Sequence, residues 1–368
     1  MSGRDVLVAA GVLFPDERGR VLVAYRSAHP VEVPGGGWEV ADAAARATAV
    51  REVREEWGVT PVLRELACLD WSRDAGRPPL VVFLYWADPL TAEQLAALRP
   101  QAAELSGFAH LTADQLDSAL TPVLARRVGA CLRAPRSAAP LELADGRPVG
   151  HSALHPGSRP APPYTGPAGL LPGAGEAVVV PPLDRAAYLA GLPRLRAKAR
   201  MLFTDAAGRV LLLRLTPWEG QSGWLLPGGS VEADRELPRD AARRETLEEL
   251  GWRREPGRLL TVDWIADHPW DPPHLSLTYD GGTVTPEQLA AIRLQEEEIV
   301  EWRLCTPAEA AEVLRPSALR RLTACLAVRA LPPGAGPAEL LCGAPPDGAG
   351  RTGPRRFAAG DGGRTGYE

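Results

Sequence analysis

The feature that most constrains the fold is an internal repeat, because a chain with two copies of one sequence folds into two copies of one domain. The segment LACLDW at residues 66–71 corresponds to LLTVDW at 259–264. Further along, AEQLAALR at 92–99 corresponds to PEQLAAIR at 286–293. These pairs stand 193 and 194 positions apart. The two copies, called repeat 1 and repeat 2, therefore keep their register over most of a domain.

The composition between the repeats predicts a linker. Twelve prolines fall between residues 134 and 193, too many for a third folded core. The last segment is rich in Gly, Pro, Arg and Asp and has almost no apolar residues, which is typical of disorder. We expect repeat 1 at 1–133, a Pro/Gly-rich linker at 134–193, repeat 2 at 194–343 and a disordered tail at 344–368.

Short apolar runs and helical patterns occur together in each repeat. The runs predict strands at 6–14, 20–26 and 80–86, with counterparts at 199–203, 209–215 and 274–279. The patterns predict helices at 43–57, 237–250 and 307–330. Strands mixed with helices in each copy predict an α/β (α+β) protein made of two α/β/α sandwiches, each with a mixed sheet.

Charge and hydropathy exclude several classes of protein. The chain has 46 acidic and 41 basic residues, a net charge of −5, which argues against a nucleic-acid partner. No apolar run reaches the length that a membrane span needs. The five cysteines form no CxxC pair, which disfavours a disulfide scaffold and structural zinc. We expect a cytoplasmic protein without a membrane partner.

A cluster of carboxylates follows a Gly-Gly loop in repeat 2. The segment LPGGS at 226–230 precedes Glu236, and RETLEELG follows at 244–251. Glutamates at positions i, i+3 and i+4 share one face of a helix, where like charges repel. A hard cation such as Mg²⁺ removes this conflict, because it prefers oxygen ligands and is shared with waters and substrate phosphates. The three carboxylates are Glu245, Glu248 and Glu249.

Repeat 1 has the same pattern with one difference. REVREEWG at 51–58 follows VPGGG at 33–37 and places three glutamates in the same geometry. Ala43 stands at the position that corresponds to Glu236, and Asp42 is next to it. The three carboxylates are Glu52, Glu55 and Glu56.

Both segments resemble the Nudix box, GX5EX7REUXEEXGU, in which U is a bulky apolar residue. Repeat 2 departs from this pattern in three ways. The stretch between Gly229 and Glu236 is one residue longer, Thr246 replaces an apolar residue, and Trp252 is an unusual last apolar residue. Repeat 1 lacks the first glutamate of the box.

The resemblance implies a hydrolase that cleaves a pyrophosphate bond in a nucleotide or nucleoside diphosphate derivative with Mg²⁺ or Mn²⁺. Repeat 2, with the more complete box, is then the main active site. The resemblance implies as metal ligands Gly229, Glu245, Glu248, Glu249, Glu52, Glu55 and Glu56. It implies as catalytic residues Glu248, Glu249, Glu298, Glu55 and Glu56, with Arg244, Glu236 and Arg51 as supporting residues.

Several alternatives stay open from the sequence. Glu298, whose counterpart is Glu104, is either the residue that accepts the proton of water or part of a solvated acidic loop. Repeat 1 is either a second hydrolase or a module that senses a nucleotide or ADP-ribose-like ligand. The two repeats could also pack as a pseudo-dimer in which one supports the other. His268 and His274 are expected in loops, since neither has a second histidine at metal-ligand spacing.

Overall fold

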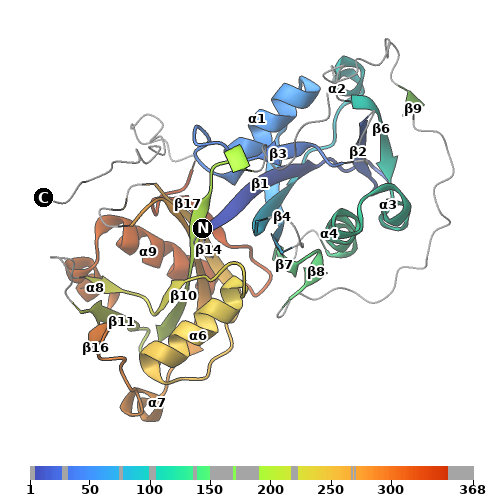
Figure 1. The fold of residues 1–368 in the computed structure, drawn as a ribbon. Coiled ribbons are helices and arrows are strands. Elements are labelled where there is room, and N and C mark those ends of the chain that lie inside the picture. Colours follow the sequence, from blue (N-terminus) through green and yellow to red (C-terminus); the bar gives the residue numbers. More distant parts are fainter. Residues whose placement is uncertain are drawn as a thin grey trace, which may run out of the picture.

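The computed structural model describes residues 5–26, 32–73, 78–98, 105–135, 139–149, 169–170, 190–216, 223–266, 268 and 271–346. The two repeats have the same order of elements along the chain. Figure 1 shows repeat 1 in blue to green and repeat 2 in yellow to red. Most of the predicted linker and the tail from residue 347 lie outside the described residues.

Repeat 1 begins with a strand, a second strand and the Gly-rich segment that precedes its first helix. Its elements are β1 (Asp5–Leu13), β2 (Val21–Arg26), β3 (Gly35–Gly37), α1 (Ala45–Trp57), β4 (Leu63–Ser72), β5 (Leu80–Ala87), α2 (Ala92–Ala97), β6 (Leu105–Leu111), α3 (Ala113–Ala119), α4 (Pro122–Arg133), β7 (Leu141–Ala144) and β8 (Arg147–Pro148). A short strand that pairs with β6 follows, β9 (Gly169–Leu170).

Repeat 2 has a counterpart for almost every element. These are β10 (Leu195–Thr204), β11 (Val210–Leu215), β12 (Trp224–Leu225), β13 (Gly228–Ser230), α6 (Pro238–Leu250), β14 (Leu259–Ile265), β15 (His274–Thr283), α7 (Pro286–Ala290), β16 (Ile299–Cys305), α8 (Pro307–Val313), α9 (Pro316–Ala330) and β17 (Ala338–Leu341). The predicted duplication is therefore present at the level of individual helices and strands.

Each repeat contains a mixed sheet between helices, as predicted. In repeat 1, β1 runs parallel to β5, β5 antiparallel to β4, and β4 parallel to β7. Val53 of α1 joins the core on one face of this sheet, and Val128 of α4 joins the core on the other. Repeat 2 has the same arrangement, with β10, β15, β14 and β17 in place of these strands. The α/β/α sandwich follows because each helix buries its apolar face against one side of the sheet.

The two repeats are in direct contact. β1 and β10 pair antiparallel, with Val6 opposite Leu195, so strands of both repeats form one continuous sheet. The core on the α1 side is shared as well, because the Trp264 ring lies 6.1 Å from the Trp38 ring and 5.6 Å from the Phe83 ring.

Polar contacts cross the same boundary in both directions. Glu339 of β17 accepts a hydrogen bond of 2.6 Å from the Tyr85 hydroxyl and one of 3.0 Å from Arg46. Glu142 of β7 accepts a hydrogen bond of 2.8 Å from Arg239. Burial, followed by the nearby Glu142 carboxylate, raises the pKa of Tyr279 well above its ordinary value. Strand β7 of repeat 1 therefore reaches α6 of repeat 2, and strand β17 of repeat 2 reaches α1 of repeat 1.

Some boundaries differ from the sequence expectation. The single helix predicted at 307–330 is wrong, because α8 and α9 are separated at Arg315, whose ψ is 151°. A residue before proline avoids the helical region, and here Pro316 follows. Strands β7 and β8 fall within the predicted linker and pair in the sheet of repeat 1, so the folded part of repeat 1 extends beyond residue 133. The other predicted domain limits stay predictions.

Two further features of the described residues concern the length of the helices and the state of the cysteines. Across the described ranges, no helix is long and apolar enough to cross a membrane. All five cysteines are buried and free.

Candidate active site

The box helix of repeat 2 has well-defined ends. Helix α6 begins with Pro238 in its first turn and ends at Gly251, whose φ of 74° lies in the left-handed region that glycine tolerates best. Thr246, a departure from the box, is fully buried, and its hydroxyl donates a bond of 2.8 Å to the carbonyl of Ala242. This bond satisfies the hydroxyl, so threonine fits where the box has an apolar residue.

The Gly-Gly loop lies directly against the glutamates of α6. The amide of Gly228 donates a hydrogen bond of 2.7 Å to Glu249. A Cβ atom at Gly229 would lie only 2.5 Å from the carboxyl group of Glu245. A side chain on Gly229 would therefore displace a predicted metal ligand.

Arg244 holds the carboxylates of the box together. Its Nη2 atom donates to Glu236 at 2.8 Å and to the carbonyl of Ser230 at 3.0 Å. Its Nη1 atom donates to Glu245 and to Glu248, each at 2.9 Å. One guanidinium thus joins the loop, the first glutamate of the box and two of the predicted metal ligands.

The carboxylates differ sharply in exposure. The Glu248 side chain is 46% exposed, whereas Glu249 is only 3% exposed. Burial raises the pKa of Glu249 to about 8, with a smaller contribution from Glu245 and in spite of the bond from Gly228. Burial also raises the pKa of Glu245, although Arg244 acts in the opposite direction. Without a cation beside them, these carboxylates are held in unfavourable surroundings for their charge.

The donor set fits Mg²⁺ or Mn²⁺ as partners. Within the described ranges, no three His, Cys, Asp or Glu side chains converge into a preassembled metal cage. Mg²⁺ seldom needs one, because it keeps several waters and binds through one or two carboxylates plus substrate phosphates. The close approach of Gly229 to Glu245, and the burial of Glu249, leave oxygen ligands and loop backbone side by side. Such a site would hold a hydrated cation through Glu245, Glu248 and Glu249.

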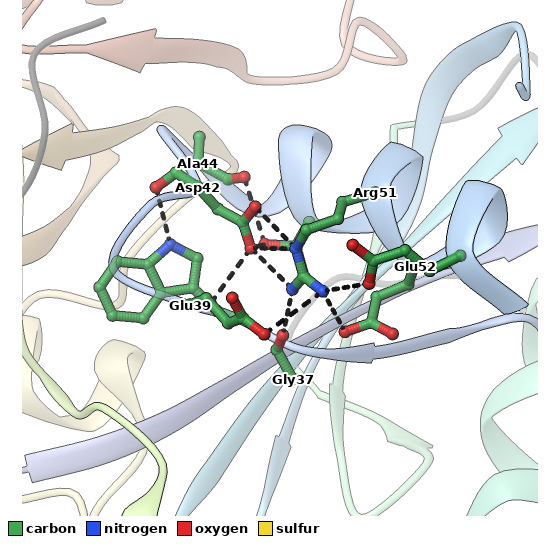
Figure 2. A network of polar contacts seen from close by, with 9 residues as sticks. Gly37, Glu39, Asp42, Ala44, Arg51 and Glu52 are labelled. Carbon is green, nitrogen blue, oxygen red and sulfur yellow. Dashed lines mark hydrogen bonds and ion pairs between the residues drawn. The ribbon is translucent and has the colours of Figure 1, made fainter.

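Arg51 occupies the corresponding position in repeat 1. Figure 2 shows its guanidinium between Asp42, Gly37 and Glu52 of α1. Nε donates to Asp42 at 3.0 Å, and Nη2 donates to Asp42 at 2.9 Å and to the carbonyl of Gly37 at 2.8 Å. Nη1 lies 2.9 Å from Glu52 and 3.0 Å from Glu55.

Asp42, not Ala43, therefore takes the part that Glu236 has in repeat 2. The sequence paired Ala43 with Glu236 because 17 positions separate the proline of Pro-Gly-Gly from the box arginine in both repeats, from Pro34 to Arg51 and from Pro227 to Arg244. The Asp42 carboxylate also accepts bonds from the Thr48 hydroxyl at 2.9 Å and from the amide of Glu39 at 3.1 Å. These bonds fold the loop back, so a shorter acid one position earlier reaches the arginine.

The rest of the repeat 1 box is looser than that of repeat 2. A Cβ at Gly36 would lie 2.4 Å from the carboxyl group of Glu52, which matches Gly229 and Glu245. The amide of Gly35 lies 3.4 Å from Glu56, longer than the 2.7 Å of the corresponding bond in repeat 2. Helix α1 ends at Gly58, with a φ of 72°.

Glu298 lies in an exposed turn before β16. Its charge is close enough to contribute to the raised pKa of both Glu245 and Glu249. The structure thus brings this residue near the box, although its role stays a prediction. Its counterpart Glu104 lies outside the described residues.

Sequence reasoning missed charged residues on β10 and misplaced one histidine. Lys198 and Arg200 alternate with buried Ala197 and Ala199 on this strand, a pattern visible in the segment LRAKARMLF. His274, expected in a loop, is the first residue of β15 and is buried. The position of Arg200 near the box follows from its bond of 3.2 Å to the carbonyl of Gly228.

An α/β/α sandwich whose helix presents glutamates to a Gly-Gly loop is the arrangement of a Nudix-type hydrolase, which acts on pyrophosphate bonds. Comparison with family models agrees: the NUDIX domain model matches residues 6–128 and 194–324. The chain therefore belongs to the NUDIX family, in two tandem copies. The predicted resemblance is confirmed.

Solved structures that match part of this chain include a MutT protein from Methanosarcina mazei, which is 23% identical, with coverage of 36% of this chain and 91% of that chain and a TM-score of 0.30. An ADP-ribose pyrophosphatase from Streptococcus suis is 19% identical, with coverage of 38% of this chain and 98% of that chain and a TM-score of 0.30. A Caenorhabditis elegans Ap4A hydrolase is 23% identical, with coverage of 36% and 97% and a TM-score of 0.30. The comparison with curated proteins returned no match.

Proposed function

We propose that the protein is a Mg²⁺- or Mn²⁺-dependent pyrophosphohydrolase with its main active site in repeat 2. Its substrate is a nucleotide or nucleoside diphosphate derivative. The observation that carries this proposal is the contact of the Gly228–Gly229 backbone with the carboxylates of Glu245 and Glu249. Family membership supports it. The raised pKa of both carboxylates supports it as well, because a bound cation would offset the cost of burying their negative charge.

In repeat 2, some residues position the carboxylates and another accepts a proton. Glu245, Glu248 and Glu249 would hold the metal, which would supply neutralisation of the charge on the phosphoryl oxygens. Arg244 holds Glu245 and Glu248 at fixed positions, and its own position is set by Glu236. Glu298, exposed and near the other carboxylates, is the proposed acceptor of the proton of water.

Repeat 1 has two candidate roles. Its complete set of bonds around Arg51 supports a second hydrolytic site. The longer distance between the Gly35 amide and Glu56 favours a non-hydrolytic module that senses a nucleotide or supports repeat 2.

We also propose that the repeats act as a pseudo-dimer. Arg46 and Arg239 stand in the first turns of α1 and α6, and they bond to β17 and β7 of the other repeat, respectively. Such reciprocal contacts are typical of a two-fold interface. They connect each box helix to the opposite repeat.

The test is the substitution of Glu248 or Glu249 by glutamine in the full chain. Because each carboxylate acts on charge that develops in the transition state, we expect kcat to fall more than KM rises. Glu255→Gln is the matched control, since Glu255 is exposed and pairs with Arg243. Unchanged turnover in the Glu248→Gln, Glu249→Gln double variant would exclude repeat 2 as the active centre. Separate measurement of phosphate and pyrophosphate release across nucleotide substrates identifies the bond that is cleaved.

A further inference from the structure

One face of the repeat 2 sheet is polar next to the box. The registers of β10, β14 and β15 place Lys198 opposite Ser276, and Ser276 opposite Asp263. Arg200 is two residues further along β10 and therefore points to the same face as Lys198. Its guanidinium donates to the carbonyls of Leu226 and Gly228, each at 3.2 Å.

In repeat 1 the three corresponding positions are apolar, although Asp70, opposite Val82, keeps the place of Asp263. The register with the Gly-rich strand makes Ala9 the counterpart of Lys198 and Gly11 the counterpart of Arg200. Val82 takes the place of Ser276, opposite Ala9. Val82 and its neighbours belong to the core of repeat 1. The two repeats therefore share their box but differ in the surface beside it.

Arg200 is a half-buried cation without a carboxylate partner among the described residues, since it bonds only to backbone carbonyls. Burial, together with the nearby Arg321, lowers its pKa, in spite of Glu249 and Asp271. An unpaired charge in such surroundings is unfavourable unless an anion joins it. Lys198 adds a second positive charge and is itself held by Asp271 at 2.6 Å.

Ser276 provides an independent sign of a ligand. It is only 1% exposed, and its hydroxyl has no hydrogen-bond partner within the described structure. A buried hydroxyl without a partner costs free energy, so its presence at this position needs an explanation. A phosphate oxygen beside Arg200 would accept its hydrogen bond.

We propose that Arg200, Ser276 and Lys198 bind a phosphate group of the substrate in repeat 2, and that repeat 1 lacks this subsite. The inference rests on the proposed function for the choice of repeat 2 as the active site. It adds to that function the side chains that hold a phosphate of the substrate, and a difference in substrate binding between the two repeats. Repeat 1, with Ala9, Gly11 and Val82 at these positions, does not select the same compound.

The first test measures binding of inorganic pyrophosphate to the full chain by calorimetry, with a chelator present so that no metal contributes. We expect saturable binding that Arg200→Gln weakens by roughly 10- to 100-fold, the effect of losing a hydrogen bond to a charged group. Arg209→Gln removes the same charge from the turn before β11, where Arg209 pairs with Asp205, and should change binding less than about twofold.

Ser276→Ala separates a ligand role from a structural one. Loss of an unpartnered hydroxyl should leave the melting temperature unchanged or higher, while pyrophosphate binding weakens. This variant also keeps the test valid if Arg200→Gln fails to fold. A lower melting temperature with unchanged binding would overturn the assignment of Ser276, and unchanged binding in both variants would overturn the subsite.

Steady-state kinetics identify which phosphate is bound. If it belongs to the pyrophosphate itself, Arg200→Gln raises KM equally for nucleotides with and without an additional phosphate. If it is an additional phosphate, only the preference for the more highly phosphorylated nucleotide is lost. Glu249→Gln should stop turnover but keep metal-free binding, so failure of the proposed function and failure of the subsite give different results.

Discussion

The acid beside Arg51 offers a sharp test of how the two repeats are related. Asp42→Ala removes the carboxylate that accepts hydrogen bonds from both Nε and Nη2 of Arg51, and Glu236→Ala is the corresponding change in repeat 2. Ala43→Glu instead restores the box as the sequence pattern has it. We expect Asp42→Ala to lower hydrolysis by repeat 1. We expect Ala43→Glu to leave this hydrolysis unchanged, because Asp42 already accepts the hydrogen bonds of Arg51.

The magnitude follows from the contacts of Asp42. The residue is 6% exposed and accepts bonds from Arg51, Thr48 and the amide of Glu39. Removing one partner of a fully buried ion pair costs about 3–5 kcal/mol. Arg51 is 20% exposed and keeps its contacts with Gly37 and the glutamates of α1, so we expect a loss of about 2–3 kcal/mol.

The assay uses the full chain with repeat 2 silenced by Glu249→Gln, so that the remaining hydrolysis reports repeat 1. We expect Asp42→Ala to lower this hydrolysis by roughly 10- to 100-fold, as for other residues that orient metal ligands. The midpoint of chemical denaturation provides a second readout that does not depend on turnover.

The reasoning would be refuted by the opposite pattern. If Ala43→Glu raises hydrolysis by repeat 1 while Asp42→Ala changes neither hydrolysis nor the denaturation midpoint, Asp42 does not orient the box. In a chain that keeps Glu249, Glu236→Ala should lower hydrolysis by repeat 2 in either case, and serves as the positive control.

Three further predictions follow from the geometry. Gly229→Ala places a methyl group against the Glu245 carboxylate. It should lower turnover by roughly 10- to 100-fold. The unfolding free energy should change by less than about 1 kcal/mol, because only the end of a side chain must move. Glu339→Ala leaves Arg46 and a tyrosine hydroxyl without their shared partner; denaturation should show a loss of about 2–4 kcal/mol, and a change below about 0.5 kcal/mol would argue against the interface. Burial raises the pKa of Glu142 above its ordinary 4.5. The folded chain therefore retains this proton at pH values where the unfolded chain has lost it. As a result, the contribution of Glu142 to stability falls as the pH rises from 4.5 toward the raised pKa. Glu142→Gln should flatten this part of the stability profile, and an identical profile in both proteins would contradict the prediction.

The sequence by itself determined the duplication, the sandwich class and the glutamate face of each box helix. These features depend on local spacing: 3.6 residues per turn brings Glu245 and Glu249 to one face in any helix, and Gly251 and Gly58 terminate the helices through their own backbone freedom. The break at Pro316 was also a local signal, and the helical periodicity on either side of it concealed the break.

Only the tertiary structure decided which acid reaches Arg51, which strands join the repeats and what lies beside the box. Asp42 replaces the glutamate of the pattern because the loop folds back through bonds to Thr48 and Glu39, and no spacing rule encodes that path. The difference between Arg200 and Gly11 becomes meaningful only when strand register places both next to the Gly-rich loop. Register and loop path depend on contacts between residues far apart in the chain, so a local pattern cannot specify them.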